Sequence, residues 1–249
     1  MGINYSPKIV TNGLVLCLDA ANSLSYPGSG TVWTDLSGNG NNGTLTNGPT
    51  YSSANRGSIV FDGSNDYANL GKPSSLDFGT GSLSISIWIK PIIGNIVKVI
   101  MSKGATSGNG SSGWWFALDN RYNNNTEGVT FSVNSSSINT SSGAKGTINK
   151  YTINQWNNIV AVWDSSTKDI YIYINNILSQ TTLVQTGGSS LAGVTDTNNA
   201  NFNTIIAAYN NGSSSFINAN MALISIYNRI LTSSEISQNY NATKGRFGL

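Results

Sequence analysis

The chain of 249 residues contains no histidine and a single cysteine, Cys17. Without histidine, neither a serine–histidine–aspartate triad nor a cysteine–histidine pair can form. Zinc would find only one thiolate, and a lone cysteine excludes a disulfide within the chain. Cys17 stands between Leu16 and Leu18 in the alternating run GLVLCLD, so we interpret it as a buried strand residue.

Charged side chains are scarce, at 10 % of the residues, compared with roughly 25 % in an average globular domain. The net charge is +2, and the basic residues are scattered apart from KGRFG near the end. A nucleic-acid-binding protein would need a denser basic stripe. The chain has neither a membrane-length apolar run nor the apolar core of a signal peptide. We therefore expect neither nucleic acid nor a membrane as a partner.

Glycine and asparagine concentrate in DLSGNGNNGTLTNGPTYSS, residues 35–53. A phosphate-binding loop would join a strand to a helix and carry a lysine. This stretch has no lysine, and after Pro49 the chain continues into the strand-like GSIVFDG. We interpret it as the turns of a β-protein, in which glycine and asparagine supply positive-φ conformations.

Short apolar runs separated by turns recur along the chain and predict an all-β fold in one domain. In LSISIWIK, residues 83–90, leucine and isoleucines alternate with serines, Trp88 and a lysine. KDIYIYIN alternates in the same way and places Tyr171 and Tyr173 opposite three isoleucines. Two antiparallel sheets packed by their aliphatic faces would form a jelly-roll sandwich, with the other faces outside.

One short helix is expected near the C-terminus, in TSSEISQNY. Thr232 and Glu235 have the spacing of a capping box, in which each side chain satisfies a backbone N–H. Ile236 and Tyr240 would supply an apolar face at i, i+4 spacing. We expect this helix to pack against the end of the sandwich.

Five stretches, taken in order, resemble the concanavalin A-like, laminin-G-like jelly-roll family: GLVLCLDAANSLSYPGSGTVWTDLSGNGNNGTL, GSIVFDGSNDYANLG, LSISIWIKP, QWNNIVAVWD and ISIYNRILTSSEI. The similarity runs over nearly the whole chain. LDAANSLSYPGSGT near the start and QNYNATKGRFGL at the end are similar to structural proteins of bacteriophages, particularly marine and cyanobacterial ones. The resemblance implies a binding or structural module, although a fold alone does not give a function.

The expected organisation has three parts. Residues 1–12 form an extended arm, interrupted by Pro7, that docks on a neighbouring subunit. Residues 13–240 form the jelly-roll domain, and residues 241–249 form a C-terminal tail that makes a second contact. A homo-oligomer is left open.

Glycoside hydrolases share this jelly roll, so the carboxylates need attention. A retaining glycosidase needs two carboxyl groups about 5 Å apart. The only glutamates are Glu127, in an expected loop, and Glu235, on the expected helix. The E-x-D-x-E pattern of the related glucanases is absent. We expect no catalytic residues and no required cofactor.

Calcium is the one cofactor that the resemblance suggests, because laminin-G-like domains often hold a structural calcium ion. Asp62, Asn65 and Asp66 in FDGSNDY can offer oxygen ligands from one turn, with Asp19 approaching from the first strand. Alternatively, Asp62 and Asp66 accept backbone hydrogen bonds in an Asx-turn that needs no ion.

Five aromatic residues are candidates for stacking on a sugar ring: Trp88, Trp114, Trp115, Tyr171 and Tyr173. In GWWFALD, alternation requires one of the two adjacent tryptophans to point away from the core. The alternative is that long loops or a neighbouring subunit cover these aromatic side chains.

The expected function is that of a non-catalytic virion structural protein at the particle surface, which stabilises the particle or attaches it to a host. A capsid decoration or head fibre is favoured, and a tail-fibre component is the near alternative. Its partners would be other virion proteins, either capsid or fibre subunits, and a host-surface glycan. The rival interpretation is a free carbohydrate-binding module that recognises a host glycan.

Overall fold

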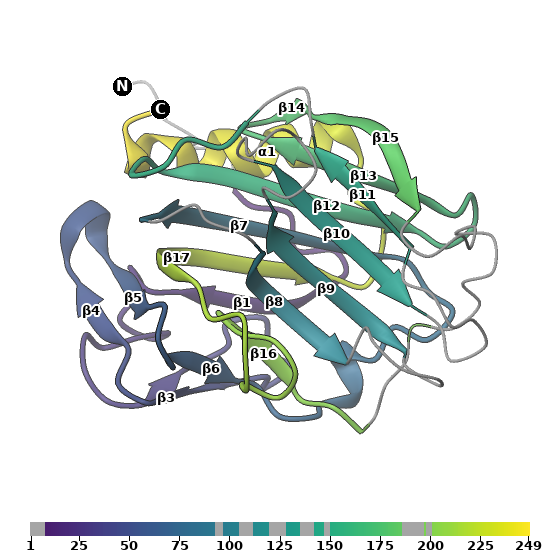
Figure 1. Ribbon diagram of the computed structural model, residues 1–249. Coiled ribbons are helices and arrows are strands. Elements are labelled where there is room, and N and C mark those ends of the chain that lie inside the picture. The colour runs from purple at the N-terminus through teal and green to yellow at the C-terminus, as the bar shows by residue number, and fades with distance from the viewer. Residues whose placement is uncertain are drawn as a thin grey trace, which may run out of the picture.

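The computed structural model describes residues 8–92, 97–104, 112–119, 128–134, 142–146, 150–185, 197 and 201–249. These residues form two antiparallel sheets packed face to face, with one short α-helix near the C-terminus (Figure 1). The predicted all-β sandwich with a single C-terminal helix is confirmed. Within the described residues, no α-helix is long and apolar enough to cross a membrane.

The first sheet has the strand order β14-β13-β12-β7-β17-β5-β4, and β1 pairs with the second half of β17. Its strands are β1 (Leu14–Asp19), β4 (Thr50–Ser52), β5 (Ser58–Asp62), β7 (Leu83–Pro91), β12 (Asn157–Asp164), β13 (Asp169–Ile174), β14 (Ile177–Leu178) and β17 (Asn218–Tyr227). Strand β17 is therefore central, because it pairs with β7 on one side and with β5 and β1 on the other.

The second sheet has the order β15-β11-β10-β9-β8-β16-β6-β3-β2. Its strands are β2 (Val32–Trp33), β3 (Gly43–Thr46), β6 (Tyr67–Asn69), β8 (Lys98–Gly104), β9 (Gly113–Leu118), β10 (Val129–Asn134), β11 (Ser142–Gly146), β15 (Gln180–Gln185) and β16 (Thr204–Ile206). The serine- and asparagine-rich patches at 105–113, 134–147 and 186–200 predict long surface loops, but strand β11 lies inside the second of them. Strand β15 is not predicted. The other expected long loops, 105–113 and 186–200, lie almost wholly outside the described residues.

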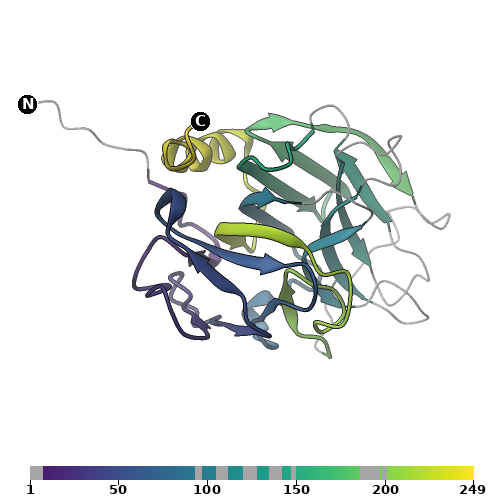
Figure 2. The ribbon, with the colours of Figure 1, turned by 60° about the vertical axis from the view of Figure 1, so that its left-hand side comes forward.

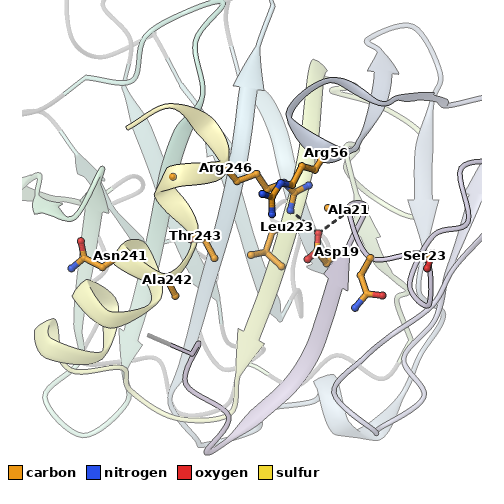
Figure 3. A pocket seen from close by; sticks show the side chains of 11 residues that line it. Asp19, Ala21, Ser23, Arg56, Leu223, Asn241, Ala242, Thr243 and Arg246 are labelled. Atoms are coloured by element: carbon orange, nitrogen blue, oxygen red, sulfur yellow. Dashed lines mark hydrogen bonds and ion pairs between the residues drawn. The ribbon is translucent and has the colours of Figure 1, made fainter. Parts of the chain in front are cut away.

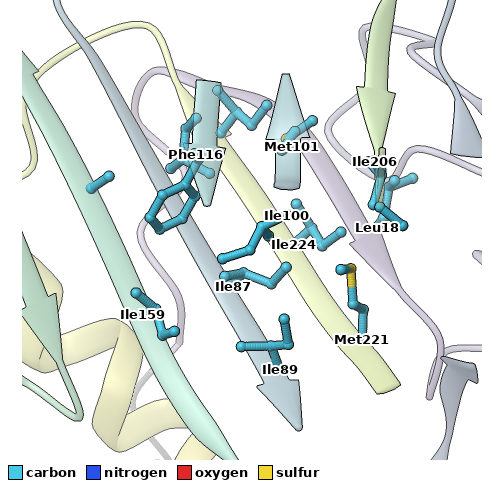
Figure 4. Close-up of a cluster of buried hydrophobic side chains, with 14 of the residues drawn as sticks. Leu18, Ile87, Ile89, Ile100, Met101, Phe116, Ile159, Ile206, Met221 and Ile224 are labelled. Carbon is cyan, nitrogen blue, oxygen red and sulfur yellow. The ribbon is translucent and has the colours of Figure 1, made fainter. Parts of the chain in front are cut away.

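The core lies between the two sheets. The isoleucines of β7 and β13 point into it, and their alternating neighbours point to the outer side of the first sheet, as the sequence predicts. Figure 4 shows part of this cluster, with Ile87 and Ile224 from the first sheet and Ile100 and Phe116 from the second. All four side chains are at most 1 % exposed.

The outer side of the first sheet is apolar as well, and the C-terminal segment covers it. Helix α1 (Ser233–Thr243) and the following 3-10 helix η4 (Lys244–Phe247) lie outside this sheet (Figure 2). Ile236 of the helix packs with Val160 and Val162 of β12, and Phe247 packs with Trp88 of β7. The expectation that the helix packs against the end of the sandwich is wrong, because the apolar face that needs cover is the sheet's own outer face.

Helix α1 begins with the predicted capping box. The backbone N–H of Glu235 donates to Thr232 Oγ1 at 3.2 Å, and the backbone N–H of Thr232 donates to Glu235 Oε2 at 3.0 Å. Arg229 adds a two-pronged ion pair to the same carboxylate, with contacts of 2.9 and 2.6 Å. The hydrogen bonds from Arg229, aided by Thr232, lower the pKa of Glu235 to about 2.

The two chain ends belong to the packed domain where they are described. Val10 donates its N–H to Asn239 and accepts a hydrogen bond from the Tyr227 hydroxyl. Residues 8–12 of the expected arm therefore dock on their own helix and on β17, and residues 1–7 lie outside the described residues. The expected tail, residues 241–249, runs through the end of α1 and η4 and packs on the first sheet.

The glycine- and asparagine-rich stretch forms turns, as predicted. Gly38 and Gly40 adopt positive φ between β2 and β3. Asn47 and Gly48, with φ of 67° and 104°, carry the chain from β3 in the second sheet to β4 in the first.

The structure also buries Cys17, and burial raises the pKa of its thiol to about 12. A thiolate is therefore not formed at neutral pH.

Replacing Glu235 by glutamine should lower stability in a pH-dependent way. A carboxyl whose pKa is lowered to about 2 by folding stabilises the protein fully above its unfolded pKa of about 4.3 and loses that contribution as the pH falls to about 2. Both side chains of the ion pair are 26 % exposed, so we expect about 1 kcal/mol, or a Tm lower by about 2–4 °C, near pH 6. Thermal unfolding followed by circular dichroism measures it. A difference that persists near pH 2 would contradict the assignment.

Candidate functional site

Trp88, the first of the predicted sugar-stacking residues, is already occupied by the protein's own C-terminus. Its ring stacks on Phe247 with centroids 4.1 Å apart and on Tyr240 at 5.7 Å. Its indole N–H donates to Thr243 Oγ1 at 2.8 Å. With the side chain 1 % exposed, no ring face is left for a sugar.

Tyr171 and Tyr173 point outward from β13, as predicted, and pack beside helix α1. Both are half-buried, and burial is the main reason why the pKa of each phenol is raised. The alternative interpretation, that these aromatic side chains are covered, therefore holds for Trp88 and in part for the tyrosines. The cover that the structure describes is the C-terminal helical segment.

The adjacent tryptophans of β9 separate as alternation requires. Trp114 points into the core, with its ring 6.5 Å from Phe78 and 6.4 Å from Phe131. Trp115 points to the outer side of the second sheet, where it stands between Ser102 of β8 and Ser132 of β10. It is half-buried. Trp115 thus stays a candidate for sugar contact, and Trp114 does not.

The residues proposed for calcium form a hydrogen-bonded turn. Asp62 Oδ1 accepts the backbone N–H of Ser64 at 2.8 Å, and this bond is the main reason why the pKa of Asp62 is lowered. Asp66 Oδ2 accepts the N–H of Asp62 at 3.1 Å, and the backbone carbonyl of Asn65 accepts from Asn47. Among the described residues no three acidic, cysteine or histidine side chains cluster as a metal site. The turn is what the structure shows, and calcium at it stays a prediction.

Asp19 lies apart from that turn and belongs to a pocket on the outer side of the first sheet (Figure 3). The pocket has a volume of about 650 Å³. Its walls come from the turn after β1, the 3-10 helix η1 (Ala54–Arg56), and the end of α1 with η4. The lining residues are Asp19, Ala21, Asn22, Ser23, Arg56, Leu223, Asn241, Ala242, Thr243, Gly245 and Arg246.

Arg246 links the walls of the pocket through its side-chain contacts. Its Nη1 contacts Asp19 Oδ1 at 2.7 Å, and its Nε donates to the backbone carbonyl of Asn55 at 2.8 Å. Its Nη2 donates to the carbonyl of Gly57. One guanidinium therefore links η4 to β1 and to both residues that flank Arg56. The side chain of Arg246 is 10 % exposed and that of Asp19 is 26 % exposed, so their ion pair is partly shielded from water.

Helix η1 is held in an uncommon backbone conformation. Asn55 and Arg56 have φ of 52° and 68°, a region that residues other than glycine rarely adopt. Trp156 donates its indole N–H to Asn55 Oδ1 at 2.9 Å, and Asn55 Nδ2 donates to the carbonyl of Arg246 at 3.2 Å. Gly57 follows at φ 138°, where a Cβ would come within 2.3 Å of the Ala20 carbonyl oxygen. The loop that carries Arg56 is thus fixed on both sides.

The lining is suited to binding through hydrogen bonds. It combines amides (Asn22, Asn241), hydroxyls (Ser23, Thr243) and guanidinium groups over the apolar side chain of Leu223. Its single carboxylate, Asp19, is paired with Arg246. Sequence reasoning missed this site because residues 19–23, 56 and 241–246 have no common local pattern. The basic KGRFG is the only local signal, and it falls in the expected C-terminal tail.

A family model described as the concanavalin A-like lectin/glucanases superfamily matches residues 62–237, more than half of the chain. The chain belongs to this superfamily. The predicted laminin-G-like resemblance is confirmed at this level. No curated protein sequence matches the chain. The bacteriophage origin stays a prediction.

Solved structures with the same fold include binding domains and a domain of a glycosidase. The binding domain of Paraclostridial mosquitocidal protein 1 has a TM-score of 0.68 at 19 % identity, covering 93 % of this chain and 52 % of that one. Domain 4 of AbnA, a GH43 extracellular arabinanase from Geobacillus stearothermophilus, was solved with arabinotriose and has a TM-score of 0.59 at 19 % identity, covering 92 % and 98 %.

The binding domain of botulinum neurotoxin DC, solved with rat synaptotagmin II, has a TM-score of 0.62 at 16 % identity, covering 94 % of this chain and 52 % of that one. The same domain was also solved with SialylT. This superfamily member therefore spans about half the length of the two toxin binding domains. At such identities the likeness shows the fold alone.

Replacing Phe247 by alanine should uncover Trp88 and lower the free energy of unfolding. The ring is 7 % exposed and stacks on Trp88 at 4.1 Å, so a loss of about 3 kcal/mol is expected. Chemical denaturation measures the loss, and tryptophan emission should shift to longer wavelength in the folded state. Leu249→Ala is the control, because Leu249 is 49 % exposed and should change stability by less than about 0.5 kcal/mol. Equal values for the two variants would refute the packing described.

Proposed function

We propose that this protein is a non-catalytic, lectin-like module that binds glycans in the pocket between η1 and the C-terminal segment. The observation that carries the proposal is the lining itself: amides, hydroxyls and guanidinium groups around a cavity of about 650 Å³. Sugar hydroxyls both donate and accept hydrogen bonds, and these side chains offer both partners. The arabinotriose complex of the structurally similar arabinanase domain supports a glycan as the ligand class.

The proposal that the protein is non-catalytic is supported by the state of the carboxylates. A retaining glycosidase needs two carboxyl groups about 5 Å apart, one of them protonated. Within the lining described, Asp19 is the single carboxylate, and Arg246 holds it as an ion pair. Glu235 is paired with Arg229 on the helix, and Glu127 lies outside the described residues. A protein with this lining binds a sugar without an acid and base to cleave it.

Blocking the pocket tests where the glycan binds. Ser23 lines the pocket and is exposed, so Ser23→Trp places a large ring there without disturbing the core. We expect binding of the best ligand from a glycan array to fall by about tenfold or more, or about 1.4 kcal/mol. Isothermal titration calorimetry is the measurement. Ser213→Trp is the matched control, because Ser213 is also exposed and is absent from the pocket lining.

Trp115 provides the competing location. If Trp115→Ala abolishes binding while Ser23→Trp leaves it unchanged, the glycan lies on the outer side of the second sheet and the pocket assignment is wrong. If glycans bind but neither Ser23→Trp nor Trp115→Ala changes the affinity, both locations are excluded. An array without any hit would remove glycan binding altogether.

We also propose that the module is displayed on a virion surface, among capsid or fibre subunits. What supports this is the resemblance of LDAANSLSYPGSGT and QNYNATKGRFGL to bacteriophage structural proteins, together with a charged fraction of only 10 %. Mass spectrometry of purified phage particles whose genome encodes the chain tests it. Hundreds of copies per particle indicate a capsid decoration, and a few dozen or fewer indicate a head or tail fibre. Absence from the particles would overturn the virion setting and leave the free glycan-binding module.

A further inference from the structure

We infer that the pocket selects acidic glycans, and that the guanidinium of Arg56 binds their carboxylate or sulfate group. This rests on the proposed function and adds the ligand class. The inference comes from three features of the pocket: its charge balance, the free donors of Arg56, and the way the backbone of Arg56 is held.

The charge balance of the pocket leaves one positive charge over. The charged lining residues are Asp19, Arg56 and Arg246. Arg246 and Asp19 neutralise each other in an ion pair of 2.7 Å. A neutral sugar would leave the charge of Arg56 unmatched, and an anionic group would pair with it.

The two arginines of the pocket differ in what they have left to donate. Arg246 uses Nε, Nη1 and Nη2 for contacts within the protein. Arg56 is exposed, and within the described part of the chain its guanidinium has no hydrogen bond or ion pair. A free guanidinium offers a planar fork of donors that matches carboxylate or sulfate oxygens in a two-pronged contact. Arg56 is thus the residue of this pocket that can bind an anion.

The backbone of Arg56 is fixed by the contacts on either side of it. Arg246 bonds the carbonyls of Asn55 and Gly57, and Trp156 holds the side chain of Asn55. The φ of 68° at Arg56 is unfavourable for any residue with a Cβ, and such conformations persist where the surroundings impose them. Holding the loop reduces the entropy that binding must overcome. The backbone that carries the cation is therefore already in place at the pocket before any ligand arrives.

The amides of the lining supply contacts for the rest of a sugar ring. Asn22 Oδ1 accepts the backbone N–H of Leu24 at 3.0 Å, which leaves its NH2 group to donate. Asn241 Nδ2 donates to Ser237 Oγ at 3.3 Å, which leaves its carbonyl oxygen to accept. Ser23 adds an exposed hydroxyl. Recognition of a single acidic sugar residue requires that its acidic group binds Arg56 and that two or three of its hydroxyl groups bond to the lining.

The test begins with an array that carries uronate-, sialate- and sulfate-bearing glycans beside their neutral counterparts. The best acidic ligand is then compared by calorimetry with its methyl ester or its desulfated form. We expect the acidic form to bind at least about tenfold more tightly, as a charge-assisted pair of hydrogen bonds implies. Whether the carboxylated or the sulfated series gives the hits identifies the anion.

Arg56→Asn is the decisive variant, because asparagine tolerates positive φ and removes the charge without straining the loop. This variant should bind the acidic ligand about tenfold or more weakly, so that the acidic and neutral forms bind with equal affinity. Its Tm should be unchanged. Arg56→Lys keeps the charge but loses the planar fork of donors. Its affinity for the acidic ligand should therefore lie between that of the unaltered protein and that of Arg56→Asn. Lys72→Asn is the charge-matched control, because Lys72 is exposed and is not part of the pocket lining.

Two outcomes would overturn the inference in distinguishable ways. If neutral glycans bind as tightly as acidic ones, or if Arg56→Asn binds like the unaltered protein, the ligand class is wrong while glycan binding stands. If no glycan binds at all, the proposed function falls together with this inference.

Discussion

Both faces of the first sheet are apolar, and much of the rest of the structure follows from this constraint. The inner face closes the core, as in any sandwich. The outer face carries Trp88, Val160, Val162 and Leu223, each at most 8 % exposed. A sheet that is apolar on both sides must be covered on both sides. Here the cover is the C-terminal segment, so the molecule has a third layer over one of its two sheets.

That third layer also creates the pocket. Phe247 lies on Trp88, and the neighbouring Arg246 reaches across to Asp19 and to the carbonyls beside Arg56. The contacts of Arg246 that hold the tail on the sheet are therefore also contacts that position η1 beside the pocket. Stability and binding are coupled in this region, whereas the two sheets themselves only supply the frame.

The sequence predicts those features that depend on neighbours along the chain. Alternation in residues 83–90 identifies both the strand and its inward face, and the spacing of Thr232 and Glu235 identifies the start of the helix. The same alternation decides that one of Trp114 and Trp115 points outward. The glycines and asparagines around residue 40 predict turns because their backbone preferences are local.

The features that the sequence does not predict depend on partners far along the chain. Nothing near Trp88 indicates that Phe247 covers it, and nothing near Arg56 indicates that Arg246 fixes the carbonyls on either side. Asp19 was expected beside Asp62 and instead pairs with Arg246. Hydrophobic periodicity gives the face of a strand but not what lies on it. It therefore does not indicate that Trp88 is covered, and it does not point to the pocket, which none of the five aromatic candidates lines.

The most direct test of this account is a crystal structure of the protein with an acidic oligosaccharide bound. The account predicts the sugar between η1 and the C-terminal segment, with its anionic group within hydrogen-bond distance of Arg56 and with Phe247 still stacked on Trp88. A sugar bound at Trp115 on the second sheet, or one stacked on Trp88 with the C-terminal segment displaced, would contradict it.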